Sequence, residues 1–270
     1  MLALLGALSA CYAPTVNRQR SYHPSDADVT ITRIVHASFI VDFGTTRVLV
    51  DPWFSPAPPL GQRETIGIAL DRIPEVRGIL ITHRHNDHFD RETLESYRHK
   101  SVRVITVRGL GEDLREMGYT DVVEIGEWEQ SQIGGAVVRA VPARHSVDET
   151  GYVLQANGVT TYLAGDSLFD EESFRAIAQE FPAIDVAVLP VGGIRIFGRR
   201  LDMNPNEAAA AVKILKPSRV IPSHYGLTGP FPFVFSSSEP ASEFSKLVQA
   251  KVPATQVIVL QPGESWHYYR

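Results

Sequence analysis

The chain has 270 residues, of which 44% are hydrophobic and 21% charged, so it has the composition of a globular protein and the length for one large domain or two small ones. Its formal net charge of −5 argues against nucleic acid as a partner, because affinity for a phosphate backbone comes from excess positive charge. The single cysteine, Cys11, excludes a disulfide framework within the chain and a cysteine-based zinc site.

Residues 1–27 are expected to form a leader and a linker ahead of a domain over residues 28–270. The apolar run that begins at Met1 ends in small residues, and Leu8–Cys11 resembles the lipobox of a bacterial lipoprotein signal, with Cys11 as the acylated residue. No Lys or Arg precedes the run, which departs from a secretory signal. We expect a protein of the bacterial cell envelope or periplasm, attached to the membrane through Cys11, with a cytoplasmic protein as the alternative.

The domain is expected to open with antiparallel strands and then to alternate helices with strands. Apolar and polar residues alternate over 28–36 and 38–43, and a third strand over 45–50 follows a turn at Gly44. A long Pro- and Gly-rich loop over 54–69 is typical of a lid or a substrate wall. The pattern then predicts strands at 79–82, 102–107 and 136–141 and helices at 91–99 and 110–117.

The second half predicts a hairpin over 152–164 that turns at Asn157-Gly158. Asn204 and Glu207 form a capping-box pattern around Pro205, which predicts a helix start. The remaining elements are expected as helices at 171–179 and 239–250, strands at 185–190, 219–222 and 256–260, and a Gly- and Arg-rich loop at 191–203. No repeat or break in composition divides the chain, so we expect one domain after the leader.

The most informative stretch is an apolar strand that leads directly into a histidine-rich loop. This loop contains His83, His85, Asp87 and His88. His83 and His85 lie two apart in an extended segment, so their side chains point to the same side. Imidazole and carboxylate are the ligands of Zn, Mn and Fe sites, so four of them within six residues predict a metal site. A solvated polar loop is the alternative.

Three more apolar strands end at a residue that can bind a metal ion. These residues are His145, Asp166 and His224. Each of these residues alone would more often be structural, either as a turn aspartate or as a buried, hydrogen-bonded histidine. Following the first motif, they predict the remaining ligands.

This ordered series resembles the metallo-β-lactamase superfamily, whose pattern is His-x-His-x-Asp-His and then a His, an Asp and a His at strand ends. The resemblance implies a mixed α/β (α+β) fold, a four-layer αββα sandwich, in a hydrolase domain over residues 28–270. It also implies two divalent metal ions, Zn first, with Mn or Fe as alternatives. One ion would be held by His83, His85 and His145, the other by Asp87, His88 and His224, and Asp166 would bridge them.

Four further stretches, 35–41, 48–53, 189–193 and 204–209, resemble one branch of that superfamily, which includes L-ascorbate-6-phosphate lactonase and N-acyl-phosphatidylethanolamine phospholipase D. Val35 departs from the Gly that the branch often has before its His. By this resemblance Asp51 would orient a metal-binding imidazole and His36 would lie near the site. The alternatives are a turn aspartate and a packed histidine at a strand end.

The resemblance implies a dinuclear metal-dependent hydrolase in which a metal-bridging hydroxide cleaves an ester-type bond, a phosphodiester or a lactone first. Asp87 and Asp166 would be the catalytic carboxylates that hold the water and move its proton. Two other classes stay open: an iron-dependent oxidoreductase of the same fold, and a non-catalytic metal-binding module.

Two groups of residues are candidates for substrate binding. Arg195, Arg199 and Arg200 suit a phosphate or carboxylate, although a solvated basic loop is the alternative. The aromatic residues Phe231, Phe233 and Phe235 would line an apolar pocket or anchor their loop. Together they predict a small or amphiphilic anionic substrate.

Overall fold

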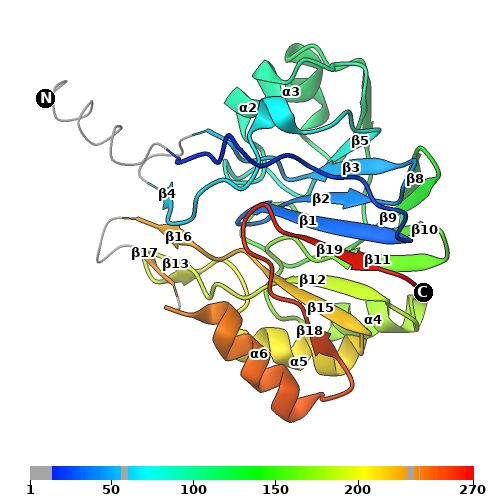
Figure 1. Ribbon diagram of the computed structural model, residues 1–270. Helices are drawn as coiled ribbons and strands as arrows, with labels where there is room; N and C mark the ends of the chain where they lie inside the picture. The colour runs from blue at the N-terminus through cyan, green and yellow to red at the C-terminus, as the bar shows by residue number, and fades with distance from the viewer. Residues whose placement is uncertain (1–13, 56–59, 230–233, 237) are drawn as a thin grey trace, which may run out of the picture.

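The computed structural model describes residues 14–55, 60–229, 234–236 and 238–270. Two large sheets lie face to face at its centre (Figure 1). The first consists, in spatial order, of β19 (Ser265–Tyr268), β1 (Val29–Val35), β2 (Ser38–Asp42), β3 (Arg47–Val50), β5 (Gly78–Ile81), β6 (Arg103–Thr106) and β7 (Asp121–Glu124). The second consists of β18 (Gln256–Val257), β15 (Arg219–Ser223), β12 (Val186–Pro190), β11 (Val159–Leu163), β10 (Thr150–Ala156), β9 (Ala136–Pro142) and β8 (Gln130–Ile133).

Helices cover the outer face of each sheet. The outer face of the first sheet carries α2 (Arg91–Ser96) and α3 (Gly111–Glu116), with the short 3-10 helix η1 (Leu70–Arg72) beside them. The outer face of the second carries α4 (Glu171–Glu180), α5 (Pro205–Leu215) and α6 (Pro240–Lys251). The predicted four-layer αββα sandwich is therefore confirmed.

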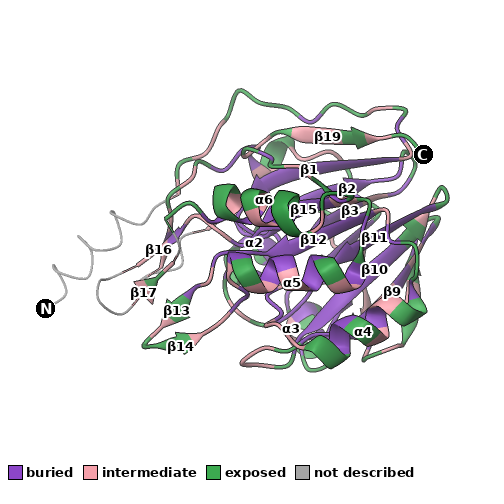
Figure 2. Cartoon of the chain, turned by 90° about the horizontal axis from the view of Figure 1, so that it is seen from below, coloured by how far each residue is buried: buried purple, intermediate pink, exposed green. Residues whose placement is uncertain are grey.

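The central strands of both sheets are buried on both faces, as Figure 2 shows in purple for β1, β2, β3, β10, β11 and β12. Along β5, Leu80 packs between the two sheets, whereas Ile79 and Ile81 pack beneath α2 and α3. Because side chains alternate along a strand, one apolar run can supply two layers of core. This arrangement explains why the run before the histidine loop is uniformly apolar.

The two sheets share one plan, and this plan gathers the site. In each, antiparallel strands are followed by parallel ones, so β3 and β5 run parallel in the first sheet, and β11, β12 and β15 in the second. Parallel strands present their carboxyl ends at the same edge of a sheet, where polar side chains can meet. An isolated bridge between His83 and Glu149 joins the two sheets at that edge.

Local sequence accounts for several element ends as predicted. Asn204 accepts hydrogen bonds from the first turn of α5, and Glu207 completes the capping box. The β10–β11 hairpin turns at Asn157 and Gly158, which both have positive φ. Helix α2 ends at Ser96, earlier than expected, and its start is capped by the Asp90 side chain.

Several strands were missing from the sequence prediction. The last strand is shorter than expected, because β18 covers only Gln256–Val257, and β19 follows it and pairs with β1. Strands β7 and β8 are edge strands with few apolar residues. The expected loops also contain short strands: β13 (Arg195–Ile196), β14 (Arg199–Arg200) and β17 (Val234–Phe235) form one small sheet, and β4 (Gly61–Gln62) and β16 (Leu227–Thr228) form another.

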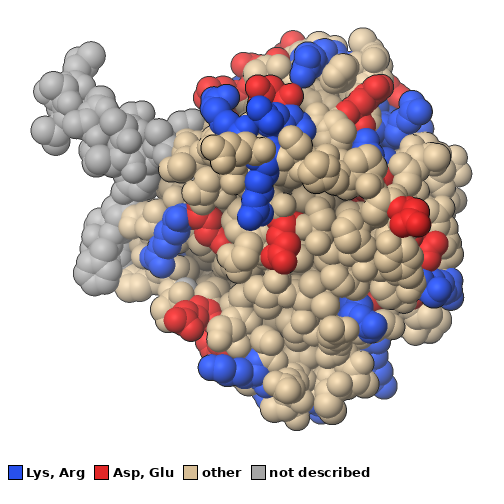
Figure 3. Space-filling model, in the orientation of Figure 1, with Lys and Arg blue, Asp and Glu red and all other residues tan. Residues whose placement is uncertain are grey.

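The leader falls partly outside the described residues, and Cys11 is among those left out. The described part of the linker lies against the domain, since Val16 pairs with Ile66 and the buried Tyr22 hydroxyl donates a hydrogen bond to Asp42. Within the described ranges, no helix combines the length and apolarity needed to cross a membrane. Acidic and basic side chains are interspersed on the face in Figure 3, so this face carries no large patch of one sign.

Candidate metal centre

The predicted ligand residues come together at the edge where the strands end. His83 follows β5, His145 follows β9, Asp166 follows β11 and His224 follows β15. The backbone of the histidine loop turns tightly, because the amides of His88 and the next residue both donate to the His85 carbonyl. Residues from both halves of the chain therefore face one another across the sandwich.

The first cluster consists of His83, His85, His145 and Asp166, with one ligand atom from each lying within 4.8 Å of the others. The Nε2 atoms of His83 and His145 each lie 3.0 Å from His85 Nδ1. A single ring proton cannot satisfy three converging nitrogens, whereas a cation can accept a lone pair from each. Zinc–nitrogen bonds of about 2.0–2.1 Å place ligand atoms near such separations.

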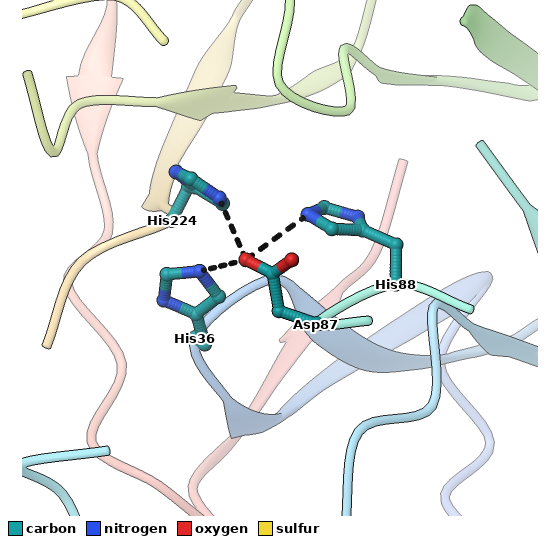
Figure 4. A group of neighbouring side chains, drawn as sticks. All are labelled: His36, Asp87, His88 and His224. Carbon is teal, nitrogen blue, oxygen red and sulfur yellow. Dashed lines mark hydrogen bonds and ion pairs between the residues drawn. The ribbon is translucent and has the colours of Figure 1, made fainter. Parts of the chain in front are cut away.

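The second cluster consists of His36, Asp87, His88 and His224, and Figure 4 shows its three rings turned towards one oxygen of Asp87. The Nε2 atoms of His36, His224 and His88 lie 3.3, 3.5 and 3.9 Å from Asp87 Oδ2. Asp166 lies between the two clusters, with Oδ2 at 2.8 Å from His224 Nε2 and Oδ1 at 3.0 Å from His88 Nε2.

The hydrogen bonds of these histidines leave the converging atoms free to bind a cation. In four rings Nδ1 faces an oxygen acceptor: Tyr225 carbonyl for His36, Glu149 for His83, Asp51 for His88 and Asp202 for His224. This fixes the ring proton on Nδ1 and directs the Nε2 lone pair inward. Among the described residues, the buried atoms His88 Nε2, His224 Nε2 and Asp166 Oδ1 make no well-aligned hydrogen bond, and their close contacts are the charge contacts with Asp166 given above. The donor set therefore fits two divalent cations.

The electrostatics of the protein alone point the same way. Burial acts to raise the pKa of Asp166, but the charges of His224 and His88 outweigh it and hold the pKa well below its ordinary value. Burial acts to lower the pKa of His88 and His224, but the Asp166 carboxylate and its neighbours hold both well above 6.5. Burial lowers the pKa of His83 to about 3 and that of His145 to about 4. Protons on two histidines thus balance the buried carboxylates where cations would otherwise do so.

Three orienting carboxylates surround the clusters, and sequence reasoning identified only Asp51. It accepts hydrogen bonds from His88 Nδ1 and from the backbone amide and hydroxyl of Thr82, each at 2.8 Å. Asp202 accepts from His224 Nδ1 at 3.0 Å and from the Ile194 amide, and burial raises its pKa to about 6. Glu149 accepts from the Asp166 amide at 2.6 Å, and burial and the Asp166 charge raise its pKa to about 8.

Neither Asp202 nor Glu149 carries a motif of its own. Asp202 lies at the end of the loop that was expected to be Gly- and Arg-rich, and Glu149 lies four residues after His145. Closeness to a strand-end histidine was therefore a signal for Glu149 alone, because Asp202 lies 22 residues from His224.

Three site residues adopt a left-handed backbone conformation that favours glycine. The φ angles are +52° at His36, +43° at Asp51 and +55° at His224. Such a conformation costs a non-glycine residue on the order of 1–3 kcal/mol, and it persists where the surrounding structure enforces it. Here it turns each side chain inward immediately after its strand ends.

A cavity of about 370 Å³ opens above the clusters. Its described lining consists of Leu60, Arg84, His85, Asn86, Asp87, Val147, Asp166, Ile194, Ile196, Leu201, His224 and Leu227. Two larger hollows, of about 770 and 530 Å³, lie over α4 and α5 and beside α2, away from the ligand atoms. A further hollow of about 400 Å³ reaches one ligand residue, His145, whereas the 370 Å³ cavity is lined by residues of both clusters. The cavity next to the clusters is therefore the relevant one.

The residues expected to bind substrate are not part of this described lining. Arg195 and Arg199 are exposed on the β13–β14 hairpin, and Arg200 forms an ion pair with Glu207. Phe231 and Phe233 lie outside the described residues. Phe235 is 47% exposed on β17.

Comparison with known proteins places this architecture in a family. The UPF0173 metal-dependent hydrolase of Thermococcus kodakarensis is 31% identical over 246 residues, which are 87% of this chain and 98% of that protein. Igni18, a metallo hydrolase from Ignicoccus hospitalis, has a similar fold, with a TM-score of 0.72 and 24% identity over 90% of this chain and 99% of its own. The diiron β-hydroxylase CmlA of Streptomyces venezuelae shares the fold at a TM-score of 0.71 and 23% identity, over 91% of this chain and 55% of CmlA.

The model of the beta-lactamase superfamily domain matches residues 46–225, which include every strand end that carries a predicted ligand. The T. kodakarensis relative also aligns over nearly its whole length. The match to the family model and this alignment both agree with the αββα architecture and the His-x-His-x-Asp-His loop. The chain therefore belongs to the beta-lactamase superfamily.

Proposed function

We propose that this protein is a metal-dependent hydrolase that binds two divalent cations in the two clusters. The observation that carries the proposal is the convergence of eight side chains, from both halves of the chain, with their ligand atoms directed inward. The names of the relatives, which are metal-dependent hydrolases in several archaea, support the same activity. Zinc is the first candidate, with manganese and iron as alternatives, because imidazole and carboxylate accept all three.

Bound divalent cations lower the pKa of water towards neutrality and polarise the carbonyl or phosphoryl oxygen under attack. The protein supplies the rest of the chemistry. Asp87 and Asp166 lie between the rings of the clusters, where their carboxylates can orient the attacking water and accept its proton. Asp51 and Asp202 hold the rings of His88 and His224 in the tautomer that presents Nε2.

We propose an ester-type bond as the target, with a phosphodiester or a lactone as the starting candidates. The resemblance of the 35–41, 48–53, 189–193 and 204–209 stretches to a branch with a lactonase and a phospholipase supports this choice. An iron-dependent oxidoreductase is the second candidate, because CmlA, named a diiron β-hydroxylase, shares the fold. A non-catalytic metal-binding module is the third. Export and attachment through Cys11 also remain proposals, and radiolabelled palmitate incorporation in a bacterial host tests them.

Elemental analysis of protein purified without added metal, together with a panel of phosphodiester, ester and lactone substrates, tests the hydrolase. We expect about two equivalents of metal and turnover of one bond class. Asp166→Ala is expected to abolish turnover while the fold persists, and His99→Ala, an exposed histidine away from the clusters, serves as the matched control. Full activity in the metal-loaded Asp166→Ala protein would contradict the site assignment. Stoichiometric iron with oxygen consumption would favour the oxidoreductase.

A further inference from the structure

The wall of the cavity above the clusters is a hydrophobic cluster of its own. Trp53, Ile194 and Leu227 are buried at its base, and Leu60, Ile196, Leu201 and Val234 pack against them partly exposed. Apart from Trp53, which follows β3, these residues lie in or next to the two small sheets. They are separate from the three main cores of the domain.

The lining combines an aliphatic wall with a polar floor. Six described lining residues are aliphatic, namely Leu60, Val147, Ile194, Ile196, Leu201 and Leu227. The floor is formed by the ligand residues His85, Asp87, Asp166 and His224. A substrate that fills this space must therefore place a polar, reacting group on the floor and an apolar portion against the wall.

The cavity has little positive charge of its own to bind an anionic substrate. Arg84 is the only Lys or Arg in its described lining, and its Nη2 donates a hydrogen bond to the Gly109 carbonyl at 3.0 Å. Arg200, one of the candidates from the sequence, is paired with Glu207. Bound cations would offset the charge of the two carboxylates on the floor, Asp87 and Asp166. Among the described lining residues, a phosphate away from the reacting group would therefore meet a single guanidinium, that of Arg84, set among aliphatic side chains.

Hydrogen bonds connect the aliphatic wall to the clusters. The Ile194 amide donates to Asp202 Oδ1, and the other oxygen of the same carboxylate accepts from His224 Nδ1. On the opposite side, Leu227 pairs with Gln62 in the β4–β16 sheet, three residues after His224. The Asp202 carboxylate that orients the His224 ring therefore also holds Ile194 of the wall in place next to the floor.

We propose that this cavity is an acyl-chain site and that the substrate is a carbonyl ester with an aliphatic chain. The proposal rests on the hydrolase function proposed above and names its substrate class. At roughly 30 Å³ per water-sized group, about 370 Å³ holds on the order of a dozen non-hydrogen atoms. Subtracting the three atoms of the ester group leaves room for a chain of roughly eight to ten carbons.

The step is an ordinary hydrolysis. The oxygen of water bonds to the carbonyl carbon, the ester C–O bond breaks, and the leaving oxygen takes up a proton to become an alcohol. One proton of the water goes to this alcohol and the other is released to the solvent, so the acid product carries the aliphatic chain away as a carboxylate. No oxidant or reductant is required.

A series of p-nitrophenyl esters from acetate to octanoate, with bis(p-nitrophenyl) phosphate alongside, tests the proposal on the metal-loaded full chain. We expect kcat/KM to rise about two- to fourfold per methylene until the cavity is filled. Ile196→Ala is expected to lower kcat/KM for octanoate roughly tenfold and so to flatten the dependence of kcat/KM on chain length. Ile214→Ala is the matched control, because this partly buried isoleucine lies on α5, against the core beneath the second sheet. Ile196→Leu, which conserves volume, should retain the preference.

Binding supplies a readout without turnover. Octanohydroxamate is expected to bind at least tenfold more tightly than acetohydroxamate in calorimetry, and Ile196→Ala should remove that difference. Hydrolysis without dependence on chain length, or faster hydrolysis of the phosphodiester, would overturn the acyl-chain site and leave the hydrolase standing. Absence of turnover on every substrate, with the hydroxamate preference intact, would overturn the hydrolase and leave the site standing.

Discussion

Replacing Asp202 with asparagine is expected to weaken metal binding without unfolding the protein. The Asp202 carboxylate accepts two hydrogen bonds, from His224 Nδ1 and from the Ile194 amide. An asparagine can accept only one of them, and its amide group then faces the other donor. If it keeps the Ile194 bond, the ring proton of His224 is driven to Nε2, the atom directed at the second cluster.

Loss of a carboxylate that orients a ligand histidine typically costs 10–100-fold in metal affinity, or about 1.4–2.7 kcal/mol. Competition titration of Zn²⁺ against a chromophoric chelator measures it, and circular dichroism checks the fold. Asp121→Asn is the matched control, because its half-exposed carboxylate pairs only with Arg103 in the described contacts. Wild-type affinity for both ions in Asp202→Asn would refute the reasoning.

Three further predictions follow from the site and the core. Removing metal with a chelator should lower Tm by about 5–10 °C, because a ligand at 100 times its Kd adds about 2.7 kcal/mol to the free energy of unfolding. Scanning calorimetry should show that Zn²⁺ restores the original Tm. Because the pKa values of His88 and His224 are raised, a cation must displace their protons when it binds, and the apparent metal affinity should fall as the pH falls. Calorimetry in buffers of different ionisation enthalpy measures the protons released. Metal binding without proton release would contradict this prediction. Leu80→Ala, between the sheets, should cost about 2–5 kcal/mol in urea unfolding, whereas Val259→Ala, 39% exposed, should cost little; equal losses would contradict the layer assignment.

The strand ends were predictable because two signals coincide in them. The apolar run of β5 predicts a buried strand, and the polar residues His83 and His85 that follow it are not typical of a hydrophobic core. The same reasoning found Asp166 and His224. Strand β19 was not predictable, because its residues alternate weakly and its partner β1 lies more than two hundred residues away.

The orienting and lining groups depend on tertiary approach and leave no local pattern. Asp202 meets His224 only after the 191–203 loop folds back as the β13–β14 hairpin. Likewise, composition cannot reveal that Arg200 is paired with Glu207, which removes it from the set of free cations that the sequence offered. Metal-binding residues at single strand ends can therefore be predicted from the sequence, whereas contacts between side chains of different loops cannot.

The left-handed conformations of His36, Asp51 and His224 have an evolutionary consequence. Glycine at any of the three would relieve strain, so a library selected only for thermal resistance should enrich glycine there and lose its metal. A relative in which activity is no longer selected should drift the same way. Glycine at these aligned positions would then identify relatives that keep the αββα fold and have lost metal binding.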